Sequence, residues 1–278
     1  MPGFIVSACQ MRQVSNEKLT IISCDNLPSN GDVTKTVVME FAHAVDENIA
    51  KWIEKNVNFC NSMVDRIVPA TTADDIQQLS DTLGYTDNSL VITEPFKQWV
   101  IEDNLPDERP DWAGAGAIIT NDVAGFEKTK LRILNGAHST LTYLGLLAGI
   151  ETVEDAVNTP ALRSFVDGLI RVESIPTIDA PAGLSLTDYW SQIQARFENP
   201  HIRHLLEQIS HDGSQKIPAR IFPVILHHMT SGHTARRACF VAAAWIAFNQ
   251  SRRAGENNPV DAYLDQISDS LPSVGLSA

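Results

Sequence analysis

Three residues with chemically useful side chains, Lys130, Asn135 and His138, lie close together on one predicted helix. At about 100° per residue, Asn135 falls roughly 140° and His138 roughly 80° around the helix axis from Lys130. All three therefore lie within one half of the helix surface. The rise of about 12 Å between Lys130 and His138 can be partly closed by the long lysine side chain. The spacing thus allows a base, a neutral donor and an imidazole to face one pocket.

The spacing by itself leaves two interpretations open. An amine acts as a general base only when it is neutral, and lysine reaches that state when burial disfavours its charged form. The alternative is a solvated Lys130, a surface Asn135 and a His138 that is bonded to a backbone carbonyl.

The segment that carries these residues resembles the catalytic helix of a known family. The sequence KLRILNGAH, residues 130–138, is similar to that helix in the long-chain, metal-independent mannitol dehydrogenase family, and the pattern KxxxxNxxH is complete. This family includes polyol 2-dehydrogenases and the fructuronate and tagaturonate reductases. Three further blocks match the family in the same order: SCDNLPSNG (23–31), NSMVDRIVP (61–69) and ENPHIRHLLEQISHDGSQKIPARI (198–221).

The resemblance implies an NAD(P)-dependent oxidoreductase that interconverts a secondary alcohol of a polyol or sugar acid with the corresponding ketose or keto-acid. In that scheme Lys130 is the general base, and Asn26 and Asn135 hydrogen-bond the reacting oxygen. His138 contacts a substrate hydroxyl and helps to orient the base. Asp65 matches a position near the nicotinamide and the substrate. The cofactor is NAD or NADP.

Structural alternatives remain for two of these residues. Asn26 is equally suited to a turn, and Asp65 to a structural ion pair with its neighbour Arg66.

Family members also use a basic residue from the later helical region to reach the substrate. Arg203, Lys216 and Arg220 are the candidates here, and the sequence does not choose among them. An anionic substrate would need an arginine of this kind to bind its carboxylate.

A glycine-rich phosphate loop is missing from these residues. No GxGxxG follows a strand and opens a helix, and the one GxG, Gly114 to Gly116, has no acidic residue about 20 positions later. We therefore expect an interior piece of the family that lacks the first βαβ units. This absence also supports an alternative function, an inactive or non-catalytic domain that binds a sugar or a protein.

Composition narrows the class of protein. A formal charge of −13 argues against a nucleic-acid partner, because such binding draws on clustered lysine and arginine. The longest apolar run, 238–248, is shorter than the about 20 residues of a membrane span. No membrane association is expected, and the expected location is the cytoplasm.

The cysteines and histidines suggest neither disulfides nor a metal site. Widely spaced cysteines among apolar neighbours predict reduced, buried thiols: Cys9, Cys24, Cys60 and Cys239. The histidines of the second half lack the spacing of a metal-ligand set, although His204 and His211 could share a helix face.

Hydrophobic patterning predicts strands first and helices afterwards. Expected strands are 19–24, 89–93 and 96–102, with helices at 32–56 and 73–83, the latter capped by Thr71 or Thr72. Later helices are expected near 121–148, 152–170, 186–197, 199–210, 217–230, 234–252 and 259–269.

The expected fold is α/β followed by mainly α, a partial Rossmann-type sheet remnant plus an all-helical C-terminal domain. The domain boundary is placed near Gly116 to Asn121. Residues 1–120 would form the C-terminal portion of a nucleotide-binding domain, and residues 121–278 a helical domain that carries the catalytic helix.

Overall fold

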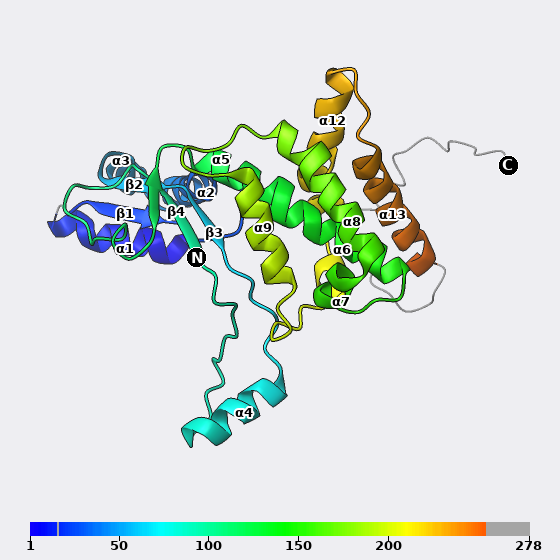
Figure 1. Cartoon of the computed structure of the whole chain (residues 1–278). Helices are drawn as coiled ribbons and strands as arrows, with labels where there is room; N and C mark the ends of the chain where they lie inside the picture. The colour runs from blue at the N-terminus through cyan, green and yellow to red at the C-terminus, as the bar shows by residue number, and fades with distance from the viewer. Residues whose placement is uncertain (16, 254–278) are drawn as a thin grey trace. The chain divides into compact units, whose positions relative to one another are not determined.

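The computed structural model describes residues 1–15 and 17–253, which fall into two compact units (Figure 1). Residues 1–67 and 95–127 form the first unit, and residues 68–94 with those from 128 onward form the second. The first unit is α/β and the second is helical. The predicted fold class, α/β followed by mainly α, is therefore confirmed.

The first unit combines short strands with helices that cover them. Its elements are α1 (Pro2–Ser15), β1 (Leu19–Ile22), α2 (Asn30–Val45), α3 (Glu47–Asn56), β2 (Val57–Cys60), β3 (Ser62–Asp65), β4 (Gln98–Glu102), β5 (Ile118–Thr120) and most of α5 (Val123–Lys130). Apolar residues of α1, α2, α3 and β2 form its core, among them Cys9, Ala42, Ile53 and Phe59.

Two small sheets carry the strands. β1 pairs with β2 in parallel, with Leu19 opposite Val57, and α2 and α3 form the crossover between them. In the other sheet β4 is central, antiparallel to β3 and parallel to β5. The predicted strand at 19–24 exists, but β1 is half-buried along its length and not fully buried.

The helix predicted at 32–56 is wrong as a single element, because it is broken at Asp46. This residue has an extended backbone, φ −163° and ψ 124°, and its side chain accepts a hydrogen bond from the Asn48 amide. An aspartate in this conformation caps a new helix. The long amphipathic pattern thus contains two helices, α2 and α3.

The strand predicted at 89–93 is also wrong. These residues have no ladder partner among the described residues, and the carbonyl of Leu90 accepts a hydrogen bond from the Thr71 hydroxyl instead. A β-branched run becomes a strand only when a second backbone pairs with it. The strand expected at 96–102 begins two residues later, as β4.

The second unit begins with α4 (Ala73–Leu83), which lies where it was predicted. Thr72 is its N-cap, and the reciprocal hydrogen bonds between Thr72 and Asp75 form a capping box. Gly84 ends the helix with a positive φ of 77°. Ten residues after Gly84, the carboxylate of Glu94 links this segment to α9 through a buried ion pair in which Arg196 donates two hydrogen bonds.

The remaining described residues of the second unit are helical. In order they are η1 (Leu131–Asn135), α6 (Gly136–Leu147), α7 (Val153–Asn158), α8 (Pro160–Gly168), η2 (Leu169–Ser174), η3 (Ile175–Thr177), α9 (Leu186–Phe197), α10 (Leu206–Ser210), α11 (Gly213–Arg220), α12 (Phe222–Thr230) and α13 (Arg236–Arg253).

Several predicted helix bounds need correction. The helix expected at 152–170 is interrupted at Thr159, where Pro160 starts a new helix. The helix expected at 199–210 is confined to α10, and that expected at 217–230 is two helices that meet at Ile221. The predicted helix 259–269 lies outside the described residues.

The central helix of the second unit is α6. It contacts α7, α8, α10 and α13, and nearly all of its residues are buried (Figure 1). The buried residues of α6 include four polar ones, His138, Ser139, Thr140 and Thr142. No helix in the described part of the chain is long and apolar enough to cross a membrane.

Candidate active site

The helix that carries the three predicted residues contains a π-helical turn. Lys130 ends α5, η1 follows as a π-helix over Leu131–Asn135, and α6 begins at Gly136. The amide of Gly136 donates to the carbonyl of Leu131, five residues earlier. The expected uninterrupted α-helix over 121–148 is therefore wrong at this point, because the π turn holds about one residue more than an α turn.

This extra residue changes which side chains share a face. Removing about 100° from the offsets of an uninterrupted α-helix leaves Asn135 roughly 40° and His138 roughly 20° from Lys130. The three residues are thus closer to a single line than the spacing predicted. π turns of this kind are frequent at functional sites.

Burial of Lys130 contradicts the interpretation of a solvated lysine. Its relative exposure is 8%, and the preceding residue, Thr129, is 1% exposed. The charge of Lys130 contributes to the lowered pKa of His138, so the two side chains lie near each other.

His138 is buried in an aromatic pocket of the second unit. Its ring stacks on Phe197 with centroids 4.5 Å apart and meets the edge of His204 at 5.3 Å. Burial lowers the pKa of His138 well below 6.5, and the charges of His204, Arg220 and other nearby cations lower it further. The imidazole is therefore neutral at physiological pH.

Hydrogen bonding at His138 is incomplete. Its Nε2 is buried and meets no hydrogen-bond partner among the described residues, so the alternative of a histidine satisfied there by a backbone carbonyl is wrong. Asn135 is half-buried, and its carboxamide likewise makes no hydrogen bond within the described part of the chain. Buried polar atoms are normally paired, so these groups are available to a ligand.

The three basic residues among which the sequence did not choose differ in their exposure and in their partners. Arg203 is 75% exposed and forms an ion pair of 3.5 Å with the equally exposed Glu151. The ammonium of Lys216 donates to the carbonyl of Ile209 at 3.3 Å. Arg220 is directed toward α6, where its Nη1 donates to the hydroxyl of Ser139 at 3.1 Å. Among the three, Arg220 is the side chain next to His138.

Asn26 belongs to the first unit and lies in the exposed loop that follows β1. Asn30 fixes this loop: its Nδ2 lies 2.8 Å from the carbonyl of Asp25 and 3.0 Å from that of Ser23. Asn30 was missed as a positioning residue, because its NG dipeptide is also typical of a simple turn. The sequence signal that could have found it is the neighbouring Gly31, which implies a close approach of backbones.

Asp65 also belongs to the first unit, at the end of β3. It is 2% exposed, whereas Arg66 is exposed. Asp65 lines a cavity of about 240 Å³ together with Trp99, whose Nε1 has no hydrogen-bond partner in the described residues. A buried carboxylate beside such a cavity can accept hydrogen bonds from hydroxyl groups.

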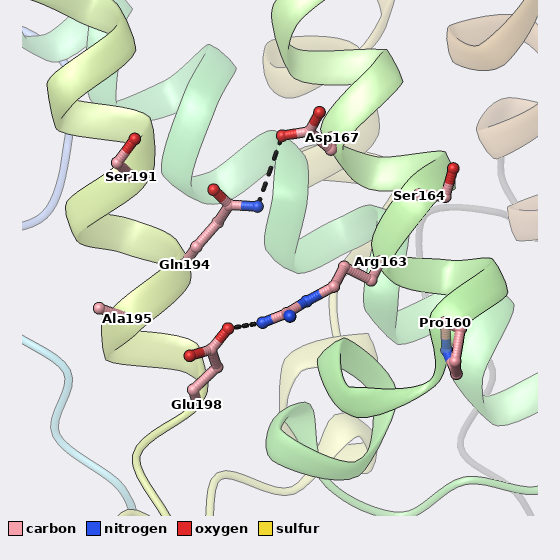
Figure 2. Close-up of a pocket in the computed structure, with 8 residues that line it drawn as sticks. All are labelled: Pro160, Arg163, Ser164, Asp167, Ser191, Gln194, Ala195 and Glu198. Carbon is pink, nitrogen blue, oxygen red and sulfur yellow. Dashed lines mark hydrogen bonds and ion pairs between the residues drawn. The ribbon is translucent and has the colours of Figure 1, made fainter.

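A second hollow of the helical unit has a different character. It measures about 550 Å³ and lies between α8 and α9 (Figure 2). Arg163 pairs with Glu198 across it, and Gln194 donates to Asp167. Burial tends to raise the pKa of Asp167, but hydrogen bonds from Trp190 and Arg171 lower it overall. The charged groups that line this groove are paired with side chains of the same groove, so we do not assign the groove to catalysis.

The cysteines of the described residues form no disulfide. All four cysteines are free; Cys9 and Cys60 are buried as expected, whereas Cys24 and Cys239 are exposed. Burial raises the pKa of Cys60 to about 11. No cluster of three or more His, Cys, Asp or Glu side chains suited to a metal ion occurs in the described part of the chain.

Comparisons with known proteins agree in one family. The model of the mannitol dehydrogenase Rossmann domain matches residues 1–114, and that of the mannitol dehydrogenase C-terminal domain matches residues 122–274. A D-mannonate oxidoreductase from Escherichia coli (strain K12) is 44% identical over 89% of this chain and 51% of its own length.

Two solved structures are also similar. A D-sorbitol dehydrogenase in substrate-free form has a TM-score of 0.83 at 33% identity, over 89% of this chain and 51% of its own. The mannitol 2-dehydrogenase of Pseudomonas fluorescens, in a ternary complex with NAD and D-mannitol, has a TM-score of 0.78 at 37% identity, over 90% of this chain and 51% of its own. The chain thus spans about half the length of the relatives that it matches. On these matches over nearly its whole length, the chain belongs to the mannitol dehydrogenase family.

Proposed function

We propose that the protein containing this chain is an NAD(P)-dependent oxidoreductase. It interconverts a secondary alcohol of a polyol or sugar acid with the corresponding ketone, with Lys130 as general base. The single observation that carries the proposal is the pair of buried side chains Lys130 and His138 beside the half-buried Asn135, with the imidazole Nε2 of His138 lacking a partner among the described residues. Family membership and the relatives named mannonate oxidoreductase and mannitol 2-dehydrogenase support the same reaction.

Lys130 takes the hydroxyl proton during oxidation and returns it during reduction. A positioned base contributes most when it can accept the proton as the carbonyl forms. The neutral imidazole of His138 hydrogen-bonds a substrate hydroxyl through Nε2 and fixes the substrate beside the amine. The low pKa of His138, caused mainly by burial, keeps a second positive charge away from the lysine.

The reacting oxygen gains negative charge as its proton leaves. Asn135 donates a hydrogen bond to this oxygen, a task suited to a carboxamide because it donates without taking the proton. The family resemblance assigns the same task to Asn26, which belongs to the first unit. The nicotinamide ring of a bound NAD or NADP would supply the acceptor for the hydride.

Residues of the first unit suit the nicotinamide end of NAD or NADP. Asn26 follows the parallel strand β1, and ligands of open α/β sheets bind beyond the carboxyl ends of such strands. Asp65 lines a cavity of the same unit, on the sheet that contains β3. No GxGxxG loop occurs in the sequence, so we assign these residues to the nicotinamide and the substrate, and not to the pyrophosphate.

The two parts of the chain are proposed to bind different molecules. We assign residues 1–120 to the cofactor-binding part and residues 121–278 to the substrate-binding part that carries the base. The four free cysteines are compatible with the reducing environment of the cytoplasm, where we place the enzyme.

The proposal is tested by steady-state kinetics of the intact protein that contains these residues. Mannitol, arabinitol, fructose, fructuronate and tagaturonate are each assayed with NAD(H) and NADP(H). Lys130→Ala is expected to lower kcat on the best substrate about 1000-fold, since a positioned base contributes roughly 10² to 10⁴. The matched control is Lys128→Ala, which removes a neighbouring lysine and should retain turnover.

Full turnover by a folded Lys130→Ala variant would refute the assignment of the base. Absence of oxidoreductase activity on every substrate of the panel would favour a binding role for the helical unit instead.

A further inference from the structure

Arg220 is a half-buried cation whose charge is not matched by a nearby carboxylate in the described residues. Within the described residues its guanidinium donates a hydrogen bond to the hydroxyl of Ser139, and the phenol of Tyr143 also acts on it electrostatically. Neither group is a carboxylate. By contrast, the buried Arg196 is held by two hydrogen bonds to the carboxylate of Glu94.

The location of Arg220 links it to the candidate active site. Arg220 ends α11, which packs on η1 and α6. Its carbonyl oxygen lies 3.8 Å from the position that a Cβ on Gly136 would occupy, and its guanidinium reaches Ser139. The charge acts on His138, between these two positions in the sequence. Arg220 therefore lies along the same turn of α6 that follows Asn135.

Burial of a guanidinium is unfavourable unless its donors are used. Arginine carries five N–H donors, and one of them is occupied by Ser139. Burial lowers the pKa of Arg220 to about 10, which still leaves the side chain charged at neutral pH. A carboxylate would balance the positive charge of the guanidinium and accept two parallel hydrogen bonds from its N–H groups. A hydroxyl could accept a hydrogen bond but would not balance the charge.

We propose that Arg220 binds the carboxylate of the substrate, and that the substrate is consequently a sugar acid and not a neutral polyol. This inference rests on the proposed dehydrogenase function and names the substrate class of the same site. The carboxylate would lie against α11 while the reacting hydroxyl faces Lys130 and Asn135. Arg203, exposed and paired with Glu151, has no such role.

The test compares a matched acid and alcohol, D-mannonate and D-mannitol, in the intact protein. Wild type is expected to show a kcat/KM at least about 100-fold higher for mannonate, given the strength of a partly buried charge pair. Arg220→Met should lower kcat/KM for mannonate about 100-fold or more, mainly by raising KM. The loss of kcat/KM for mannitol should be about ten times smaller than the loss for mannonate. Arg203→Gln is the control and should change neither value.

Arg220→Lys is the second variant, and it keeps the test decisive if Arg220→Met does not fold. It keeps the charge but not the two-pronged geometry, so an intermediate loss of about tenfold on mannonate is expected. A wild type that prefers mannitol, or turns over neither compound, would overturn the inference, as would an equal loss on both compounds in Arg220→Met. These results are distinct from failure of the proposed function, which is judged by Lys130→Ala on whichever substrate is turned over.

Discussion

Two Asn-Gly pairs in this chain look alike in sequence and differ in structure. Asn30-Gly31 opens α2 in the first unit, and Asn135-Gly136 joins η1 to α6 in the second. Asn30 is 1% exposed; its amide nitrogen lies within 3.0 Å of three carbonyl oxygens, and its oxygen accepts from the amide of Ser62. The carboxamide of Asn135 makes no hydrogen bond in the described part of the chain.

The glycines differ in the same way. A Cβ on Gly31 would lie 2.5 Å from backbone atoms of Cys60, so this glycine permits close contact between α2 and β2. A Cβ on Gly136 would meet its nearest atoms at 3.7 Å, an ordinary contact distance.

The comparison separates a structural role from a functional one. A buried polar group whose hydrogen bonds are complete stabilises the fold, because losing it leaves its partners unpaired. A polar group that lies among buried residues without partners is available to a ligand. By this criterion Asn30 supports the fold, whereas we propose that Asn135 serves the reaction.

The largest effect is expected for Asn30→Ala against Asn135→Ala. Asn30→Ala should lower the free energy of unfolding by about 3 to 5 kcal/mol, because several buried carbonyls and the amide of Ser62 lose their partner. Asn135→Ala should cost less than about 1 kcal/mol of stability but lower kcat about 100-fold, as expected for a donor to the reacting oxygen. Denaturant titration and steady-state kinetics measure the two. Equal destabilisation by both variants would remove the distinction.

A smaller effect is expected for alanine at the two glycines. Gly31→Ala should destabilise by about 2 to 3 kcal/mol, because backbone atoms of Cys60 must shift. Gly136 has helical angles, φ −62° and ψ −46°, so Gly136→Ala should be neutral or stabilise by up to about 1 kcal/mol. Thermal unfolding of both variants provides the measurement. A stable Gly31→Ala protein would show that the close approach of α2 to β2 is not required.

The smallest effect concerns the pH dependence of stability in the second unit. Burial lowers the pKa of both His138 and His204 in the folded state, so the unfolded chain binds more protons below pH 6.5. Their stabilisation is complete above pH 6.5 and is lost as the pH falls toward the folded values. The slope for one such group approaches about 1.4 kcal/mol per pH unit.

Denaturation between pH 8 and 5.5 tests this expectation. His138→Gln should flatten the dependence, whereas the control His227→Gln, at an exposed position, should follow wild type. Parallel curves for wild type and His138→Gln would mean that His138 contributes nothing to it.

The sequence by itself determined the family, the order of an α/β part before a helical part, and the helix with Lys130, Asn135 and His138. These features depend on local pattern: apolar periodicity, capping residues such as Thr72, and a motif within one helix. Predicted helix bounds were wrong where a capping residue interrupts an amphipathic pattern. At Asp46, for example, the side chain caps a second helix although the apolar periodicity continues.

Only the tertiary structure decided the rest. Whether 89–93 forms a strand depends on a pairing partner elsewhere in the chain, and none is found among the described residues. Which of Arg203, Lys216 and Arg220 is directed toward the site depends on what packs beside each of them. The π turn at η1 likewise brings Lys130 and His138 onto one face by a backbone hydrogen-bond shift that side-chain spacing does not encode. Spacing specifies neighbours along a helix, whereas burial and unpaired charge are properties of residues brought together by folding.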